Sequence, residues 1–286
     1  MRVLVTGGLG FVGSNLVDRL IELGHSVTVL DNLVSESSSN KYRNKDANYI
    51  IEDIRNIVFD EPITDDERFD VIYHLAGLAR IQPSFGMPTE YIDVNVSGTA
   101  KVCELARQHN AKLVYSGSST FYGGTHKSPY GFAKWTGEEV CKMYSNVYKL
   151  KTSILRFFNV YGDRQPENGE YATIVGIFER QMRNKEDLTV VGDGKQRRDF
   201  THILDICDGL IAASKDDWYG EEFALGTGKN YSINELASMF GGNVKYIPKR
   251  RGEAQETLAD TEKTSKLLKW KATRSLVEYI NKFKEK

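Results

Sequence analysis

Short apolar runs alternate with longer amphipathic stretches along the first half of the chain. We expect five runs rich in β-branched residues to form strands: Val3–Thr6, His25–Asp31, Asn48–Ile51, Phe69–Gly77 and Lys112–Ser116. The intervening residues fit helices, and strands that alternate with helices are typical of parallel βαβ units. The pattern therefore predicts an α/β fold built on a doubly wound parallel sheet. The last third of the chain is irregular and mixed, and 286 residues allow one large domain or one domain with a smaller lobe.

The first predicted strand runs directly into a glycine-rich turn with Gly7, Gly10 and Gly13, and a helical stretch follows. Gly7 allows the turn, Gly10 leaves room for a pyrophosphate at backbone N–H groups, and Gly13 lets the helix lie close to the strand. The positive end of the helix then attracts the anion. This is the arrangement of a Rossmann-type dinucleotide site, although glycines alone also fit a turn that binds nothing.

Acidic residues follow the next two predicted strands. Asp31 ends the second strand, 18 residues after Gly13. A carboxylate there accepts hydrogen bonds from the adenosine ribose hydroxyls and repels a 2′-phosphate, so the sequence favours NAD over NADP. Asp53, after the third strand, either faces the adenine amino group or caps a helix. Ser14 and Asn15 stand where a P-loop has Lys and a hydroxyl residue, so nucleotide triphosphate hydrolysis is not expected.

A long helix is predicted from Pro88 to Asn110. Its Asn95, between Val94 and Val96, is either a buried polar anchor or an exposed side chain. We favour the anchor, because a polar side chain between two apolar ones is otherwise hard to place. The acidic connection before the fourth strand contains Pro62 and is expected to be a loop.

Hydroxyl residues, including Ser118, follow the fifth predicted strand, at the sheet edge where doubly wound folds bind ligands. Farther along the chain, Ser128 fits a helix N-cap and Pro129 fits the first helical position. Tyr130 and Lys134 are therefore predicted on one face of a helix, about one turn apart.

This tyrosine and lysine have the chemistry of a general base and its activating cation. A free phenol has a pKa of about 10, so a base at neutral pH needs a pKa about three units lower, which is about 4 kcal/mol. An ammonium group roughly 4 Å away contributes about that much at an effective dielectric constant of about 20, and a cationic nicotinamide adds to it. The alternative is two residues that happen to lie four apart on a surface helix. After five strands and a glycine turn we favour the catalytic interpretation.

Composition narrows the classes of partner. The 286 residues include 38 Lys and Arg against 39 Asp and Glu, so no overall field attracts nucleic acid or an anionic membrane. Cys103, Cys141 and Cys207 lack a Cys-x-x-Cys spacing, which favours buried thiols in a reducing compartment, and the histidines show no metal-ligand spacing. No charged and apolar leader precedes the first strand, and no apolar run approaches about 18 residues. We therefore expect a cytoplasmic protein with a small-molecule ligand and no metal.

Six motifs spread over nearly the whole chain occur together in one enzyme family. They are Thr6–Gly13, His74–Gly77, the serine run that ends at Gly123, Tyr130 with Lys134, Arg156–Gly162 and Gly192–Phe200. Together they resemble the extended short-chain dehydrogenase/reductases, specifically the nucleotide-sugar epimerases and dehydratases, and most of all the UDP-glucose/UDP-N-acetylglucosamine 4-epimerases. The resemblance implies NAD as the cofactor, a UDP-sugar as the substrate and a homodimer.

The resemblance also implies roles for individual residues. The implied catalytic residues are Ser118, Tyr130 and Lys134, with Ser118 bonded to the sugar oxygen that is oxidised. The implied cofactor-binding residues are Gly7, Gly10, Phe11, Val12, Asp31, Asn32, Asp53, Ile54, Leu75, Ala76, Gly77, Asn95, Tyr130 and Lys134. The implied substrate-binding residues are Ser84, Ser118, Asn159, Arg198, Arg250 and Thr257. Arginine suits the substrate diphosphate because its fork matches phosphate oxygens in pairs, and Arg251 is the alternative to Arg250.

The residues after Ser118 select among the reactions of this family. Relatives that dehydrate or decarboxylate the keto sugar carry an acid just after the serine, where this chain has Ser119 and Thr120. We therefore expect a C4 epimerisation, in which the 4-keto sugar rotates and takes the hydride back on its other face. Thr257 stands where glucose-restricted 4-epimerases carry a bulky aromatic, so we expect room for an N-acetyl group. The alternatives are a 4,6-dehydratase or reductase of the same family and, more distantly, a non-catalytic NAD sensor.

The resemblance and the irregular last third together imply two parts. Residues 1–165 are expected to form the NAD-binding domain. Residues 166–286 are expected to form mainly the substrate lobe, which is smaller and of mixed α/β structure. A later segment, about 188–215, is expected to return to the NAD-binding domain. Val140, Tyr144 and Val147 share a helix face that either packs on the core or joins a helix bundle between two subunits.

Overall fold

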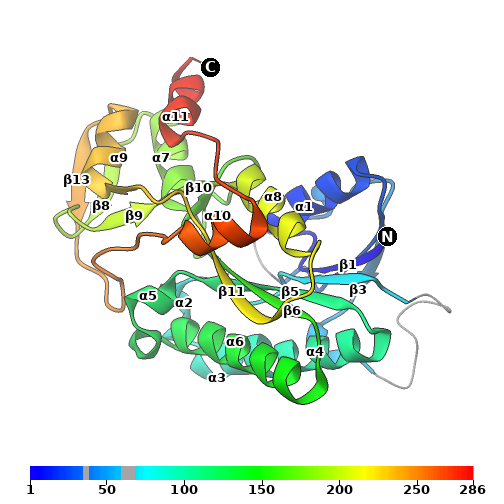
Figure 1. The fold of residues 1–286 in the computed structure, drawn as a ribbon. Coiled ribbons are helices and arrows are strands. Elements are labelled where there is room, and N and C mark those ends of the chain that lie inside the picture. Colours follow the sequence, from blue (N-terminus) through cyan, green and yellow to red (C-terminus); the bar gives the residue numbers. More distant parts are fainter. Residues whose placement is uncertain (35–38, 59–67, 286) are drawn as a thin grey trace.

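A seven-stranded parallel sheet forms the centre of the molecule in the computed structural model, which describes residues 1–34, 39–58 and 68–285 (Figure 1). Across the sheet the strands are β11 (Tyr219–Leu225), β6 (Thr152–Phe157), β5 (Lys112–Ser118), β4 (Val71–His74), β1 (Arg2–Thr6), β2 (Ser26–Asp31) and β3 (Asn48–Ile51). The five strands expected from the apolar runs are all present. The strand order reverses between β1 and β4, and such a switch point opens a ligand crevice at the carboxyl ends of the strands. The predicted fold class is confirmed.

Helices cover both faces of this sheet, as the burial of β1 requires, since Val3, Leu4 and Val5 are fully buried. On one face lie α1 (Phe11–Glu22) and α8 (Ile203–Ala213), with α10 (Glu262–Leu268) beside β11 (Figure 1). On the other face lie α4 (Gly98–His109) and α6 (Pro129–Tyr148).

The long helix expected from Pro88 to Asn110 contains an irregular turn. It consists of α3 (Pro88–Ile92), a π-helical segment η3 (Asp93–Ser97) and then α4. Asn110 ends it in the left-handed conformation, with φ 53°. A π-helical turn widens the helix locally and is frequent at functional sites.

A second lobe, seen at the upper left of Figure 1, has its own apolar core. Its elements are α7 (Ile174–Arg183), β8 (Leu188–Val191), β9 (Arg197–Asp199), β12 (Asn230–Ser232), α9 (Ile233–Phe240), β13 (Val244–Ile247) and α11 (Leu276–Lys284). Strands β8 and β13 pair in parallel, and β9 and β12 pair antiparallel. The short strands β7 (Val160–Tyr161) and β10 (Thr201–His202) connect this lobe with the sheet.

The segment from about 188 to 215 contributes elements to both parts of the structure. Within 188–215, α8 packs on the sheet against α1, but β8 belongs to the second lobe. The strand that does return is β11, which lies beyond the predicted segment and pairs with β6. Sequence periodicity gives no partner for a strand, so this crossover was not expected.

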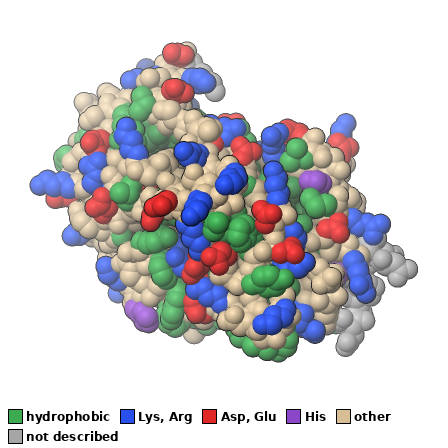
Figure 2. Space-filling model, in the orientation of Figure 1, with side chains coloured by type: hydrophobic (Ala, Val, Ile, Leu, Met, Phe, Trp, Pro, Cys, Tyr) green, Lys and Arg blue, Asp and Glu red, His purple; other side chains and the backbone are tan. Residues whose placement is uncertain are grey.

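The remaining expectations concern surfaces. Val140 and Tyr144 pack against the core beside α4, whereas Val147 is 62% exposed, next to the exposed Tyr148. Figure 2 shows hydrophobic side chains on the surface at the lower edge of the molecule, where α6 lies. Among the described residues no helix has both the length and the apolar character needed to cross a bilayer. The predicted loop containing Pro62 falls in 59–67, outside the described residues.

Candidate active site

The glycine turn between β1 and α1 has the geometry that the sequence predicts. Gly7 has a φ of 71°, in the region that favours glycine. A Cβ on Gly13 would lie 2.1 Å from the carbonyl oxygen of Gly7, so only glycine allows the helix to start this close to the strand. Gly10 is the N-cap of α1 and supplies no side-chain cap, which leaves the first N–H groups of the helix available to an anion.

Asp31, at the carboxyl end of β2, holds this turn in place. Its carboxylate is 5% exposed and accepts hydrogen bonds from the backbone N–H groups of Leu9, at 2.9 Å, and Leu33, at 2.8 Å. A carboxylate has about four acceptor sites, so two remain for ribose hydroxyls. The residue also lines the main cavity, which fits the predicted preference for NAD.

Asp53 fulfils one of its two predicted roles in the structure. It caps the short 3-10 helix η2 (Ile54–Asn56) and accepts a hydrogen bond from the Arg55 N–H at 2.8 Å. Hydrogen bonds from the Arg55 side chain, which are the largest cause, lower the pKa of Asp53 to about 2, so this carboxylate stays charged. Asp53 also lines the cavity, and its contact with adenine stays a prediction.

Two residues expected in the site lie behind its wall. Asn95 is a buried anchor as favoured: its amide donates to the Leu78 carbonyl at 2.9 Å and accepts from the Leu78 N–H at 2.8 Å. Both ends of the amide are thereby used, and Asn95 does not line the cavity, so its contact with the cofactor stays a prediction. Ser84 is fully buried, donates to the Ile81 carbonyl at 2.6 Å and also lies outside the cavity lining. The substrate contact of Ser84 stays a prediction.

The hydroxyls of Ser118 and Tyr130 meet at the carboxyl end of β5. Tyr130 reaches this place because α6 begins as predicted: Ser128 accepts a hydrogen bond from the Gly131 N–H at 3.1 Å, and Pro129 is the first helical residue. The Tyr130 hydroxyl donates to Ser118 Oγ at 3.3 Å. Thr120 Oγ1 donates to the same oxygen at 2.9 Å, and sequence reasoning gave this threonine no role at the serine.

Lys134 is directed differently from the expectation. Its side chain is 7% exposed, its Nζ donates to Ser116 Oγ at 3.3 Å, and it lies 4.5 Å from the centre of the Tyr115 ring. Burial, the largest cause, lowers the pKa of Lys134 to about 8, while the Glu138 carboxylate opposes this shift. Burial also raises the pKa of Tyr130 above its usual value, against the hydrogen bond with Ser118 and the positive charge of Arg80. Lys134 alone therefore does not lower the pKa of this phenol in the way the helix spacing suggested.

The predicted substrate residues of the C-terminal third converge on the other end of the same cavity. Asn159, Arg198, Arg250 and Thr257 all line it. Arg198 is largely buried, and its guanidinium lies 3.7 Å from the Glu253 carboxylate. The alternative residue, Arg251, stacks on the Phe85 ring at 3.7 Å and lies outside the cavity lining, so the geometry favours Arg250 for the diphosphate.

One cavity of about 870 Å³ joins these groups, from the glycine turn to the second lobe. The predicted site residues on its wall are Gly7, Gly10, Phe11, Val12, Asp31, Asn32, Asp53, Ile54, Leu75, Ala76, Gly77, Ser118, Tyr130, Asn159, Arg198, Arg250 and Thr257. The glycine turn, the buried carboxylate of Asp31 and the bare start of α1 fit a dinucleotide. The arginines at the opposite end fit a second phosphate-bearing ligand.

Sequence reasoning missed Arg80, which lines the cavity near Tyr130. A signal was available, because Arg80 is the one charged residue between Leu75 and Thr89, directly after a strand that ends at the ligand edge. A lone cation in an uncharged run at such an edge indicates a polar or charged neighbour.

The comparisons with known proteins agree with this geometry. Residues 3–226 match the family described as "NAD dependent epimerase/dehydratase family". The UDP-glucose 4-epimerase of Mycolicibacterium smegmatis is 32% identical over 99% of this chain and 97% of its own length. The crystal structure of UDP-glucose 4-epimerase with UDP-glucose from Thermotoga maritima superposes with a TM-score of 0.93 at 30% identity, covering 100% of this chain and 98% of that chain. The UDP-N-acetylglucosamine 4-epimerase of Methanobrevibacter ruminantium has a TM-score of 0.89 at 30% identity, covering 99% of this chain and 96% of that chain. The chain belongs to the NAD dependent epimerase/dehydratase family.

Proposed function

We propose that this protein interconverts the C4 epimers of a UDP-sugar through a transient 4-keto sugar, with NAD as its resident cofactor. The observation that carries the proposal is the Ser118 and Tyr130 pair at 3.3 Å, located between the glycine turn and the arginines of one continuous cavity. A sugar held by its diphosphate at Arg198 and Arg250 extends from there toward the two hydroxyls. The sugar carbon that reacts is then the one whose hydroxyl meets this pair.

Each residue of the pair has a defined task in this reaction. Ser118 Oγ orients the C4 hydroxyl by a hydrogen bond, and the phenolate of Tyr130 removes the proton of that hydroxyl. NAD, when bound, supplies a reversible hydride acceptor and a positive charge at the nicotinamide. After the keto sugar has turned in the pocket, Tyr130 returns the proton to O4 as the hydride is restored on the opposite face. Protons and electrons balance over the cycle, so no second substrate is needed.

Hydroxyls next to Ser118 favour epimerisation over dehydration. A dehydratase needs a further acid or base close to the keto sugar, to remove a proton and to expel water. The two residues after Ser118 are Ser119 and Thr120, and the Thr120 hydroxyl is already bonded to Ser118 Oγ. The same argument applies to decarboxylation.

The test is turnover of defined sugars followed by proton NMR. Purified protein is incubated with UDP-glucose and, separately, with UDP-N-acetylglucosamine, and mass spectrometry identifies what denaturation releases. We expect NAD in the released material and the galacto epimers as products. A 4-keto-6-deoxy sugar as the product would show that the protein is a dehydratase and not an epimerase. Bound NAD without any turnover would favour the non-catalytic NAD sensor.

The size of residue 257 is expected to decide whether N-acetylated sugars fit. Thr257 lines the sugar end of the cavity and is 6% exposed. Thr257→Tyr fills this space, so turnover of UDP-N-acetylglucosamine should fall at least tenfold relative to that of UDP-glucose, a loss of about 1.4 kcal/mol or more. Thr257→Val keeps the volume and serves as the control. The idea fails if the wild type turns over only the unacetylated sugar, or if the tyrosine variant retains the wild-type ratio.

We also propose that two copies associate through the outer face of α6. Met143, Val147 and Tyr148 are exposed there by 43%, 62% and 52%, and large apolar side chains gathered on one helix face favour an interface. Val147→Glu should shift the sedimentation of the protein from dimer to monomer at micromolar concentration, whereas Val277→Glu, on the exposed side of α11, should not. A monomeric wild type, or a dimeric Val147→Glu variant, would contradict this assembly.

The cytoplasm is the proposed location. NAD and UDP-sugars are present in the cytoplasm. All three cysteines are free and buried, which suits a reducing compartment.

A further inference from the structure

Arg80 occupies an unusual position at the edge of the sheet. It lies in the turn between β4 and α2 (Ile81–Ser84), where it precedes the first helical residue with a φ of 80°. A non-glycine residue in this region of backbone space is uncommon and is maintained by its surroundings. The strained backbone presents the guanidinium to the cavity, whose wall it forms.

Tyr91 connects the backbone next to Arg80 with the ring of Tyr130. The Tyr91 ring meets the Tyr130 ring edge-on, with 6.2 Å between centroids and an interplanar angle of 87°. The Tyr91 hydroxyl donates to the carbonyl of Ala79 at 2.6 Å, so the same tyrosine fixes the residue directly before Arg80. The guanidinium itself donates from Nε to the Tyr171 carbonyl at 3.1 Å, which orients the remaining N–H groups.

The charge of Arg80 is not neutralised by a neighbouring acid. No carboxylate oxygen of the described residues lies within 4.0 Å of its guanidinium. Two other arginines on the cavity wall do have an acidic partner: Arg198 has Glu253 at 3.7 Å, and Arg55 has Asp53 at 2.9 Å. Arg250, at the diphosphate end, resembles Arg80 in this respect. Arg80 is half-buried, and a cation partly withdrawn from water without a counter-ion is costly, so an anion that forms beside it relieves that cost.

Within the described residues, the groups that act on Tyr130 come from several elements. They are Arg80 before α2, Tyr91 on α3, and Tyr115 and Ser118 on β5, whereas Lys134 on α6 is bonded to Ser116. Burial raises the pKa of Tyr130, and the hydrogen bond with Ser118 and the charge of Arg80 lower it. Conversely, burial lowers the pKa of Arg80, and a charged Tyr130 raises it. The two groups thus stabilise each other in their ionised forms.

We propose that Arg80 is the cation of the active site that stabilises the Tyr130 phenolate. Arg80 acts through Tyr130, so it is a positioning residue. Arginine suits this task because a guanidinium keeps its proton at every pH at which proteins stay folded. Lys134 has a pKa of about 8 and loses its charge just above neutrality. The site therefore retains one positive charge beside the phenolate in alkaline solution.

The experiment compares pH profiles of kcat and KM for wild type, Arg80→Met and Arg80→Lys, each loaded with NAD. Tyr130 works as the phenolate, and loss of a nearby cation raises its pKa, so the rising limb of kcat should move to higher pH by about one unit or more. At neutral pH the methionine variant should then be about tenfold slower or more, with KM within about twofold of wild type. In Arg80→Lys the rising limb of kcat should return most of the way to its wild-type pH. Arg180→Met is the matched control, because Arg180 also donates to a backbone carbonyl, that of Glu167, but lies outside the cavity lining.

A second measurement does not depend on turnover, although the kinetic one rests on the proposed function. The protein is labelled with carbon-13 at tyrosine Cζ, and the resonance absent from Tyr130→Phe is followed with pH in the NAD complex. Its midpoint should be higher in Arg80→Met than in wild type. An unchanged midpoint and an unmoved limb overturn the proposal, and a raised KM with an unmoved limb makes Arg80 a substrate ligand instead. If no UDP-sugar is turned over but the titration midpoint of Tyr130 is still higher in Arg80→Met, the proposed function is refuted and the role of Arg80 is supported.

Discussion

Tyr130→Phe is expected to lower kcat by about 10²- to 10⁴-fold, because in the proposed reaction it removes the group that takes the C4 hydroxyl proton. The fold should be unaffected. In the described structure the Tyr130 hydroxyl makes one hydrogen bond, to Ser118 at 3.3 Å, and its loss costs about 1 kcal/mol or less. NAD should still be released on denaturation, since the glycine turn and Asp31 are untouched. The measurement is the rate of epimer formation by proton NMR at saturating UDP-sugar.

The control for this variant is Tyr148→Phe, on the same helix. Tyr148 is 52% exposed and belongs to the outer face of α6, so the removal of its hydroxyl should leave kcat within about twofold of wild type. Full turnover by Tyr130→Phe would eliminate the phenol as the base and with it the proposed reaction path.

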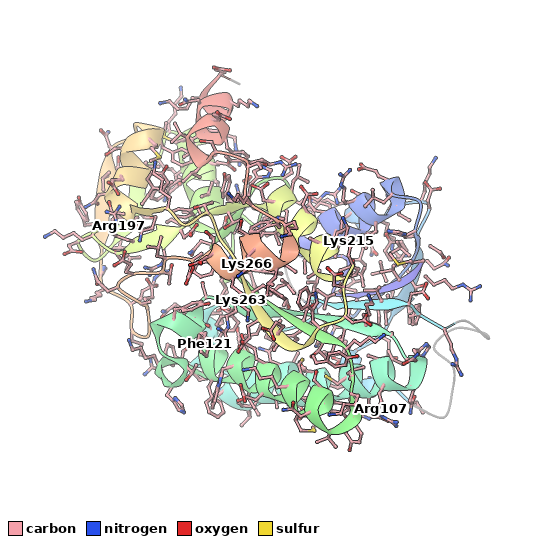
Figure 3. All side chains as sticks on the ribbon, in the orientation of Figure 1. Arg107, Phe121, Arg197, Lys215, Lys263 and Lys266 are labelled. Carbon is pink, nitrogen blue, oxygen red and sulfur yellow. The ribbon has the colours of Figure 1, made fainter. Side chains whose placement is uncertain are left out.

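Glu138→Ala is expected to lower the free energy of unfolding by about 3–5 kcal/mol, because it breaks a buried ion pair. Glu138 is 1% exposed and bonds the Arg156 guanidinium at 2.7 Å and 3.1 Å. Arg156 stacks 3.5 Å from the ring centre of Phe121, labelled in Figure 3, on α5 (Thr120–Gly123) after the catalytic serine. The substitution leaves a buried cation whose remaining acidic neighbour, among the residues that the structure describes, is Glu222 at 3.4 Å. Urea unfolding followed by circular dichroism measures the loss.

The adjacent Glu139 provides a matched control. It is exposed and pairs with Lys142 at 3.0 Å on the helix surface, so Glu139→Ala should cost about 0–1 kcal/mol. The double variant Glu138→Leu with Arg156→Met removes both charges and should be more stable than Glu138→Ala. Equal losses for the two alanine variants would show that the buried pair does not support the fold in the way described.

The sequence predicted those parts of the site whose residue types are fixed by local geometry. Gly7 and Gly13 are needed for backbone reasons, Asp31 follows from its strand, and the start of α6 follows from Ser128 and Pro129. The family resemblance and the cofactor NAD are confirmed by the family match. Each of these depends on neighbours close in sequence or on a motif with a steric cause.

The contacts that the sequence did not predict concern side chains whose partners are distant in sequence. The spacing placed Lys134 one turn from Tyr130, but its Nζ bonds Ser116 on β5, and no helix pattern contains that partner. Arg80 was missed because its position depends on a left-handed backbone and on Tyr91, neither of which periodicity reports.

The wall of the cavity comes from both ends of the chain, and this has a consequence for the order in which the protein matures. The strands from β1 to β5, which carry the dinucleotide side, are complete by Ser118. Arg250 and Thr257, on the sugar side, must close against them over more than a hundred residues, and contacts so distant in sequence form late. During synthesis on the ribosome, the elements of the cofactor half therefore emerge and can assemble well before the half that selects the sugar.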